Sequence, residues 1–94
     1  MPNAVMSFEA IARTEDSAPF MDRAVEILRE SGVKFIVGPL DTLMEGELGE
    51  LLEVVKRVNE ELSAIGGNTS ISSLIKIHFD PQGISIDQLT EGYQ

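Results

Sequence analysis

The segment VGPLDTLMEGE, residues 37–47, decides the fold because it joins a turn, a strand and the start of a helix. Pro39 fixes a bend after the preceding apolar run, and it excludes helix for the residue before it. Residues 41–45 then alternate between polar and apolar side chains, which is the pattern of a half-buried strand. Gly46 ends this strand, and Glu47 begins a long amphipathic helix with a charge that suits a helix N-terminus.

Hydrophobic periodicity outside this segment predicts the remaining elements. The clearest is the helix at 47–65, where apolar residues recur at i, i+3 and i+4 and charged residues occupy the opposite side. A second helix at 19–31 has Pro19 in its first turn, and Gly32 follows where a helix C-cap belongs. The predicted strands lie at residues 4–12, 33–37, 41–45 and 70–79, and a tail follows at residues 84–94.

This order of elements predicts a single α+β domain over residues 1–94 with the ferredoxin-like β-α-β-β-α-β fold. We expect an antiparallel sheet of strand order 4-1-3-2 with both helices packed on one face. The residues predicted to form the core of that face are Met6, Phe8, Phe35, Val37, Met44, Ile75 and Ile77.

The opposite face of the sheet has no cover from its own chain in this prediction, and we call it the open face. Its apolar residues are Val5, Ile11, Ile36, Leu43 and Leu74. An open apolar face of this size predicts a homo-oligomer packed sheet face against sheet face. The tail at 84–94 is expected to pack on the domain or on a neighbouring subunit.

Composition excludes several classes of function. The chain has a formal net charge of −9, whereas a nucleic-acid-binding protein needs a basic surface, so no nucleic-acid partner is expected. The absence of cysteine excludes thiol catalysis and thiolate metal sites, and the single His78 cannot form a multi-histidine metal site. No apolar run approaches the roughly 20 residues of a membrane span, and the N-terminus lacks the pattern of a signal peptide. We therefore expect a cytoplasmic protein without a membrane partner.

Other functions known for this fold also lack their residues here. Metal-chaperone forms need a Cys-x-x-Cys loop after the first strand. Acylphosphatase-like forms need an arginine in a glycine-rich cradle there, whereas residues 12–17, ARTEDS, hold Arg13 with two acids and no glycine. RNA-recognition forms need exposed aromatic residues on the central strands in a basic setting. None of these three conditions is met.

Polar residues that share the open face are the candidates for chemistry: Ser7, Glu9, Asp41, Glu45, Ser72, Lys76 and His78. Glu9 and Glu45 lie on neighbouring central strands, so two carboxylates could form an acid/base pair or hold a cationic ligand. They could equally form ion pairs across an oligomer interface. The sequence leaves these three readings open. We expect the Thr42 hydroxyl to form a hydrogen bond with a nearby backbone group, with a hydrogen bond to a ligand as the alternative.

Residues 38–47, GPLDTLMEGE, are similar to a Thr-x-hydrophobic-Glu-Gly-Glu segment, and on this motif the chain resembles the small thiamine-binding (thiamine/hydroxymethylpyrimidine-binding) family of ferredoxin-like proteins. The resemblance covers essentially the whole chain. It extends to SFE at 7–9, DRAVE at 22–26 and GISI at 83–86. The chain departs from many members at residues 78–81, HFDP, where those members have charged residues.

The resemblance implies a non-enzymatic protein that binds thiamine or its hydroxymethylpyrimidine moiety between subunits of a dimer or tetramer, with no cofactor and no metal. It implies Glu45 as the main ligand-binding carboxylate, because an aminopyrimidine offers hydrogen-bond donors to such a group. The expected hydrogen-bonding neighbours are Asp41, Thr42, Ser7, Glu9 and Ser72, and the expected apolar walls are Ile36, Leu43 and Leu74. The alternatives are an oligomeric structural or regulatory module without this ligand, and a small isomerase-type enzyme with Glu9 or Glu45 as base.

Overall fold

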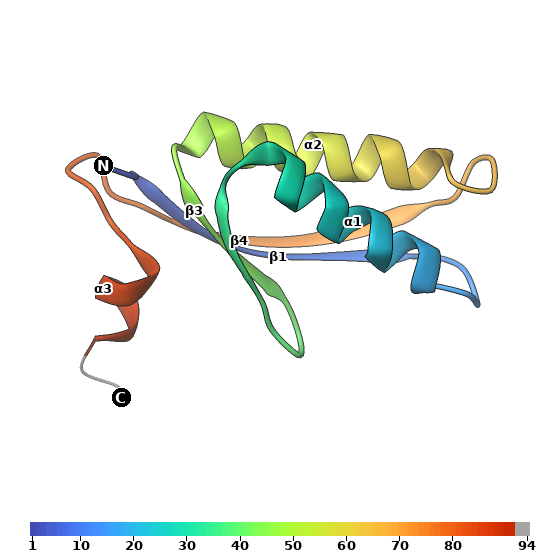
Figure 1. The fold of residues 1–94 in the computed structure, drawn as a ribbon, viewed down its shortest axis with the longest axis horizontal. Coiled ribbons are helices and arrows are strands. Elements are labelled where there is room, and N and C mark those ends of the chain that lie inside the picture. Colours follow the sequence, from blue (N-terminus) through green and yellow to red (C-terminus); the bar gives the residue numbers. More distant parts are fainter. Residues whose placement is uncertain (92–94) are drawn as a thin grey trace.

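The computed structural model describes residues 1–91 of the chain, which form one sheet with two long helices on one of its faces (Figure 1). The strands are β1 (Ala4–Ala12), β2 (Lys34–Val37), β3 (Thr42–Gly46) and β4 (Ile71–Phe79). The helices are α1 (Ala18–Ser31), α2 (Leu48–Ala64) and the short α3 (Ile86–Thr90). The last part of the predicted tail, residues 92–94, lies outside the described residues.

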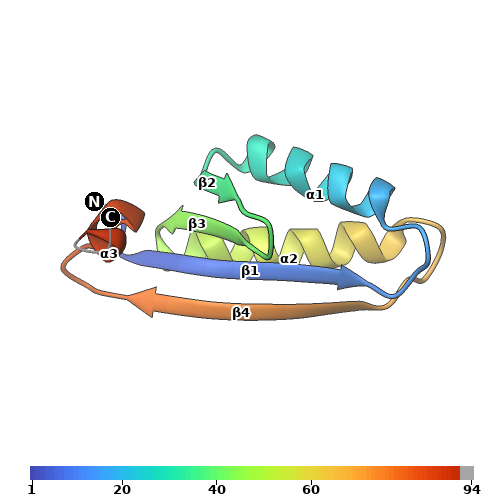
Figure 2. The same ribbon diagram turned by 90° about the horizontal axis from the view of Figure 1, so that it is seen from below.

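The sheet confirms the predicted topology. Its four strands run antiparallel in the order β2-β3-β1-β4, which is the predicted order 4-1-3-2 read from the other edge. The chain therefore has the ferredoxin-like fold. Each predicted strand and long helix is present, with its ends displaced by no more than one residue. Figure 2 shows β1 between β4 and the shorter β3.

The helix boundaries follow from local chemistry in one case and from a distant residue in the other. After α1, Gly32 has a φ of 78°, a left-handed conformation that glycine adopts without strain, and its N–H donates to the Arg29 carbonyl at 3.4 Å. At the start of α2, the Leu48 N–H donates to Oδ1 of Asn3 at 2.9 Å. The N-terminal segment thus supplies the N-terminal cap of a helix far along the chain.

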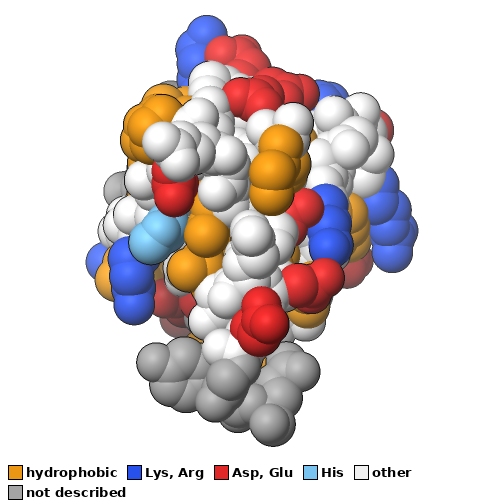
Figure 3. Space-filling view, turned by 90° about the vertical axis from the view of Figure 1, so that its left-hand side faces the viewer, with side chains coloured by type: hydrophobic (Ala, Val, Ile, Leu, Met, Phe, Trp, Pro, Cys, Tyr) orange, Lys and Arg blue, Asp and Glu red, His pale blue; other side chains and the backbone are white. Residues whose placement is uncertain are grey.

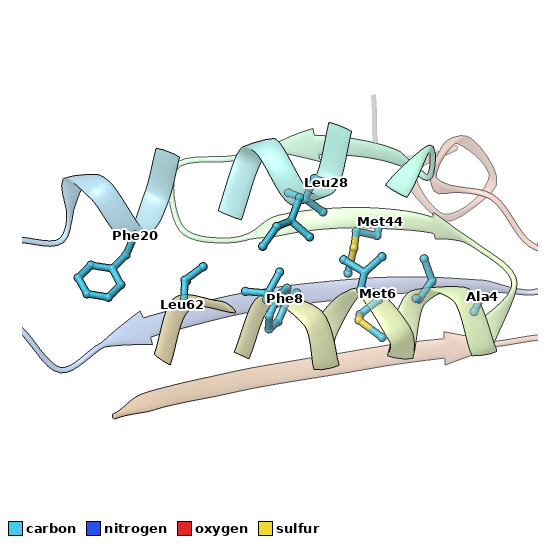
Figure 4. Close-up of a cluster of buried hydrophobic side chains, with 11 residues drawn as sticks. Ala4, Met6, Phe8, Phe20, Leu28, Met44 and Leu62 are labelled. Carbon is cyan, nitrogen blue, oxygen red and sulfur yellow. The ribbon is translucent and has the colours of Figure 1, made fainter. Parts of the chain in front are cut away.

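The core lies between the two long helices and the sheet (Figure 4). Met6 and Met44 on the central strands are fully buried, as are Ile27 of α1 and Leu51 of α2. Phe8, at the middle of β1, packs in the same cluster. The predicted core positions on β1 and β3 are therefore confirmed, and Phe35 of β2 packs against the cluster as a partly buried residue.

The prediction of core burial is wrong for three residues. Val37 is 51 % exposed, Ile75 is 43 % exposed and Ile77 is 41 % exposed. Their side chains point to the helix-packed face, because Ile75 and Ile77 pair with Phe8 and Met6, and Val37 pairs with Thr42, which itself pairs with Phe8. However, β2 and β4 are the two edge strands, and two helices do not cover the full width of a four-stranded sheet.

The central strand β1 has partners of unequal length. β4 pairs with it along its full length, from Ala4 opposite Phe79 to Ala12 opposite Ile71. β3 pairs with residues 4–8 only, and the last pair is Phe8 with Thr42. Beyond that pair the chain of the hairpin turns away, so the sheet narrows beneath the N-terminal half of α1.

The open face is partly covered by α3, which corrects the prediction that its own chain leaves it bare. The Ile86 N–H donates to Oε1 of Glu45 at 2.8 Å, and the Ile86 side chain is only 5 % exposed. Val5 of β1, which pairs with Glu45 of β3, is also buried. The described part of the tail therefore packs on its own domain. Away from α3, Ile36 and Leu74 remain exposed on this face, as predicted.

Candidate functional site

A cavity of about 310 Å³ lies where the sheet narrows, between α1, the outer half of β1 and the turn that joins β2 to β3. We call it the α1 cavity. Its walls are mainly apolar and include Phe8 of β1, Phe20 and Leu28 of α1, and Leu62 of α2. The polar residues that border it are Glu9, Ser17, Asp41 and Thr42. Apolar walls with a few polar groups are typical of a small-molecule site.

Small residues and a tight turn leave this space open. Ala10 and Ala12 of β1 and Ala24 of α1 are among the lining residues, and their short side chains occupy less of this space than larger ones would. The turn at 38–41 is closed by a hydrogen bond from the Gly38 N–H to the Asp41 carbonyl at 2.8 Å. A Cβ atom on Gly38 would lie only 3.0 Å from that carbonyl oxygen, which explains the glycine at this position.

Asp41 connects the cavity with the open face. Its backbone closes the turn, and its carboxylate Oδ2 accepts a hydrogen bond from the Ser7 hydroxyl of β1. Ser7 pairs with Leu43 and belongs to the open face. This hydrogen bond orients the Asp41 carboxylate at the edge of the cavity, and both side chains are partly buried.

Glu45, the predicted main carboxylate, is already engaged within its own chain. Its side chain is only 11 % exposed, and besides accepting from the Ile86 N–H it lies 4.0 Å from the Lys34 ammonium. The same ammonium lies 4.0 Å from Asp87 of α3. The structure thus places Glu45 at the contact between the sheet and α3.

The predicted site residues divide into two groups. Glu9, Asp41 and Thr42 border the α1 cavity, although the Glu9 side chain, which pairs with Leu74 and lies two residues after Ser7, points to the open face as predicted. The others lie on the open face: Ser7, Ile36, Leu43, Glu45, Ser72 and Leu74. Thr42 pairs with Phe8, so its side chain points to the helix-packed face, away from that of Glu45.

The acid/base reading of the carboxylates has no geometric support. Glu45 pairs with Val5, whereas Glu9 is four residues further along β1 and pairs with Leu74 of β4. Four residues of strand span about 13 Å, which is too far for two carboxylates to share a proton. Glu9 and Glu45, predicted as a pair on the central strands, therefore lie in two separate environments.

The cavity also contains residues that the sequence did not mark as functional. Phe20, Met21, Val25 and Leu28 of α1 belong to its walls. Their helical spacing indicated a core-facing helix surface, and nothing in that pattern distinguishes a filled core from a cavity wall. The missing signal is that β3 starts only at Thr42, opposite Phe8, and this is a property of the sheet.

The other concentrated group of charges joins the outer surfaces of α1 and α2. Arg23 bonds to Glu61, Glu26 and Glu30, and Arg57 bonds to Glu30 and Glu61. The hydrogen bonds from Arg23 and Arg57 hold the pKa of Glu61 below its ordinary value. Because every member pairs with an opposite charge, this network ties the two helices together.

Acidic side chains are otherwise distributed over the surface, as Figure 3 shows for the end of the molecule that carries α3. Among the described residues 1–91, no group of three or more acidic or histidine side chains is arranged to hold a metal ion. Within the same range, no helix has both the length and the apolar composition required to cross a membrane.

Comparison with known proteins gives consistent matches. The sequence profile of a family described as Thiamine-binding protein matches residues 6–94. A UPF0045 protein of Clostridium perfringens is 32 % identical over 96 residues, which cover 100 % of both chains.

Solved structures with the same fold are also similar in sequence. A Bacillus cereus structure of a domain of unknown function, DUF77, has a TM-score of 0.84 and 38 % identity, covering 100 % of this chain and 93 % of that one. A Thermotoga maritima protein provisionally assigned to thiamine biosynthesis or salvage has a TM-score of 0.81 and 27 % identity, covering 99 % of this chain and 100 % of that one.

Proposed function

We propose that this chain, which belongs to the thiamine-binding protein family, binds thiamine or its hydroxymethylpyrimidine moiety without chemically changing it. The observation that carries the proposal is the α1 cavity, whose volume of about 310 Å³ falls at the lower end of the range for small-molecule sites. Its apolar walls suit a flat heteroaromatic ring, and its polar groups suit the donor and acceptor atoms on the edge of that ring.

Asp41 is the carboxylate best placed to recognise the ligand. Ser7 holds one of its oxygens, so the group is oriented before the ligand arrives, and such preorganisation lowers the cost of binding. The ligand's exocyclic amine would donate to Asp41, while the Thr42 hydroxyl supplies a second polar contact beside it. Phe8 and Phe20 would provide apolar surface for the ring.

A subunit interface close to this site is part of the proposal. Ile36 and Leu74 leave apolar surface exposed on the open face, at 48 % and 56 %, and a second copy of the chain would bury it. Since Ser7 lies on the open face and holds Asp41, a partner packed there would border the ligand site. We propose a homo-oligomer, a dimer or a tetramer, on this basis.

Calorimetry and thermal denaturation with thiamine, its pyrimidine alcohol and its thiazole half would test the function. A ligand at about 100 times its Kd stabilises the folded state by about 2.7 kcal/mol, which raises the Tm of a domain this size by several degrees. Binding of thiamine and the pyrimidine alcohol is expected. If none of the three compounds binds at millimolar concentration, the chain is instead an oligomeric module with another partner.

Cavity-filling variants would test the location. Ala10→Leu adds three carbons to the cavity wall and should abolish binding, whereas Ala64→Leu adds the same atoms to an exposed position on α2 and should not. Circular dichroism would establish that both variants are folded. Full affinity in a folded Ala10→Leu variant would exclude the cavity.

Two carboxylate variants separate the cavity from the open face. Asp41→Asn removes the charge at the cavity and should weaken binding about tenfold, because hydrogen bonds to charged groups contribute roughly 1.5–3 kcal/mol. Glu45→Gln alters the carboxylate that the family resemblance favours. A larger loss in Glu45→Gln than in Asp41→Asn would move the site to the open face.

A further inference from the structure

We propose that the outer edge of β4 is an interaction surface for a second copy of this chain, and that two β4 strands pair antiparallel about a two-fold axis at Ile75. The two four-stranded sheets then form one continuous sheet. This surface is separate from the open face and from the α1 cavity, so the proposal does not depend on ligand binding. It rests on the backbone groups at the edge, on the apolar side chains beside them and on the charges along the strand.

The outer edge of β4 is long and unprotected. The strand has nine residues, spans about 30 Å and has only one neighbour in the sheet. Within residues 1–91, no other strand lies beyond it (Figure 2). Natural edge strands commonly carry a proline, a bulge or several charges that prevent pairing with another chain. β4 has no proline, keeps an unbroken register with β1, and its only lysine is Lys76.

The hydrogen bonds at the two ends of β4 show which of its backbone groups point outward. The Arg13 N–H donates to the Ser70 carbonyl at 2.9 Å, and the Asp80 N–H donates to the Asn3 carbonyl at 2.8 Å. Both pairs continue the β1–β4 register, in which bonded and non-bonded pairs alternate. The even-numbered residues of β4 therefore bond to β1, and the N–H and C=O groups of its odd-numbered residues point to the outer edge.

The side chains of those odd-numbered residues give the edge an apolar stripe on the helix-packed face. Its exposed members are Ile75, Ile77 and Phe79. Leu52 of α2 is also exposed, and it lies about two helical turns before Asn59, whose Oδ1 accepts a hydrogen bond from the Ser73 hydroxyl of β4 at 2.9 Å. Leu52 therefore stands on the side of α2 nearest β4. A second β4 strand with its own α2 buries this apolar surface.

The length of β4 favours one register. Opposite residues of the two antiparallel strands must point to the same face of the continuous sheet, so the axis passes through a residue rather than between two. With the axis at Ile75 the strands overlap from Ile71 to Phe79, and the odd-numbered residues exchange about ten hydrogen bonds, two for each bonded pair. An axis at Leu74 leaves Phe79 without an opposite residue in the strand.

The charges near the axis favour the same register. With the axis at Ile75, Lys76 lies opposite the partner's Leu74, which is apolar. An axis at Lys76 would place two ammonium groups directly opposite each other, where like charges destabilise a strand pair. Lys56, on the side of α2 near β4, lies 3.8 Å from Glu60, so this cation is paired within its own chain.

Size-exclusion chromatography with light scattering would test the surface. The wild-type chain should be a dimer or a tetramer at micromolar concentration, and Ile77→Lys should halve its mass, because a lysine on an edge strand opposes pairing. Ile75→Pro should act in the same way, since it removes an outward N–H and no bond to β1. Val37→Lys makes the matched change on β2, the other edge strand, at a half-exposed residue of the same face, and should leave the mass unchanged. Circular dichroism would establish that each variant is folded.

Single cysteines would test the register, because the natural chain has none. The two Cα atoms of residue 75 should lie about 5.5 Å apart across the axis, which is within the range of a disulfide. Mild oxidation should link the subunits through Ile75→Cys. It should not link them through Ile71→Cys, since the two copies of that residue lie at opposite ends of the paired strands.

Each outcome decides the proposal. A monomeric wild-type chain overturns it, and so does a folded Ile77→Lys variant that keeps the wild-type mass. Linkage through Ile71→Cys as efficient as through Ile75→Cys refutes the register. If Ile36→Lys dissociates the oligomer and Ile77→Lys does not, the contact lies on the open face, which supports the oligomer of the proposed function and rejects the pairing of β4.

Discussion

Replacing Glu45 with alanine should release α3 from the sheet. The Glu45 carboxylate accepts the Ile86 N–H at 2.8 Å, and both side chains are almost fully buried. A hydrogen bond to a charged group contributes about 1.5–3 kcal/mol, and its removal leaves the Ile86 N–H without that partner. The Lys34 contact adds little, because its ammonium is half-exposed and 4.0 Å away. We therefore expect Glu45→Ala to cost about 1.5–3 kcal/mol, nearly all of it in the docking of α3.

Hydrogen exchange measured by mass spectrometry would resolve this effect. A loss of 1.5 kcal/mol accelerates exchange through local opening by more than about tenfold, and it lowers the Tm by about 6 °C or more. Acceleration through local opening should be confined to the peptide that contains α3, whereas core amides that exchange only by global unfolding should accelerate only as far as the global stability falls. Asp87→Ala removes the other, 88 % exposed carboxylate near Lys34 and should change neither quantity. Unchanged exchange of α3 in a folded Glu45→Ala variant would refute the docking role.

Three further predictions concern stability. Hydrogen bonds from Arg23 and, to a smaller extent, Arg57 lower the pKa of Glu61 in the folded state. The contribution of Glu61 to the free energy of unfolding is therefore fully present above its unfolded pKa and is lost as the pH falls through its folded pKa. Urea denaturation from pH 7 to pH 3 should show this loss of stability, and the loss should be smaller in Glu61→Gln. Met6→Ala should cost about 2–5 kcal/mol in urea denaturation, because Met6 is fully buried beneath both helices, and a smaller loss would mean that the core collapses around it. Gly32→Ala should cost about 1 kcal/mol because φ is 78° there, while Gly49→Ala, in the first turn of α2 with open space around it, should stabilise the chain.

The fold could be predicted from the sequence because its signals are local. The stripe of apolar residues at 47–65 and the breaks at Gly32 and Pro39 each depend on a few neighbouring residues. Once the order of elements is known, the handedness of β-α-β connections leaves few topologies, and the strand order follows. The faces of β1 were predicted correctly for the same reason, since alternation is fixed by the strand itself.

The candidate site was harder to predict because it depends on where elements end and what covers them. The α1 cavity exists because β3 starts opposite Phe8, and residues 41–45 alone do not show how far along β1 they will pair. Glu45 was predicted from a motif, but its burial comes from α3, whose weak pattern gave no docking position. Val37 and Ile75 were assigned to the core by alternation, which gives the face of a sheet but not its width.

The position of β1 has a consequence for the order in which the chain folds during synthesis. β1 is the first strand made, yet it lies in the middle of the sheet, and its longest partner is β4, the last strand made. The helices α1 and α2 can begin to form as they leave the ribosome, because their contacts are local. The pairing of Ala4 with Phe79 must wait for nearly the whole chain, so the sheet closes late and folding is slower than in a helical domain of this size.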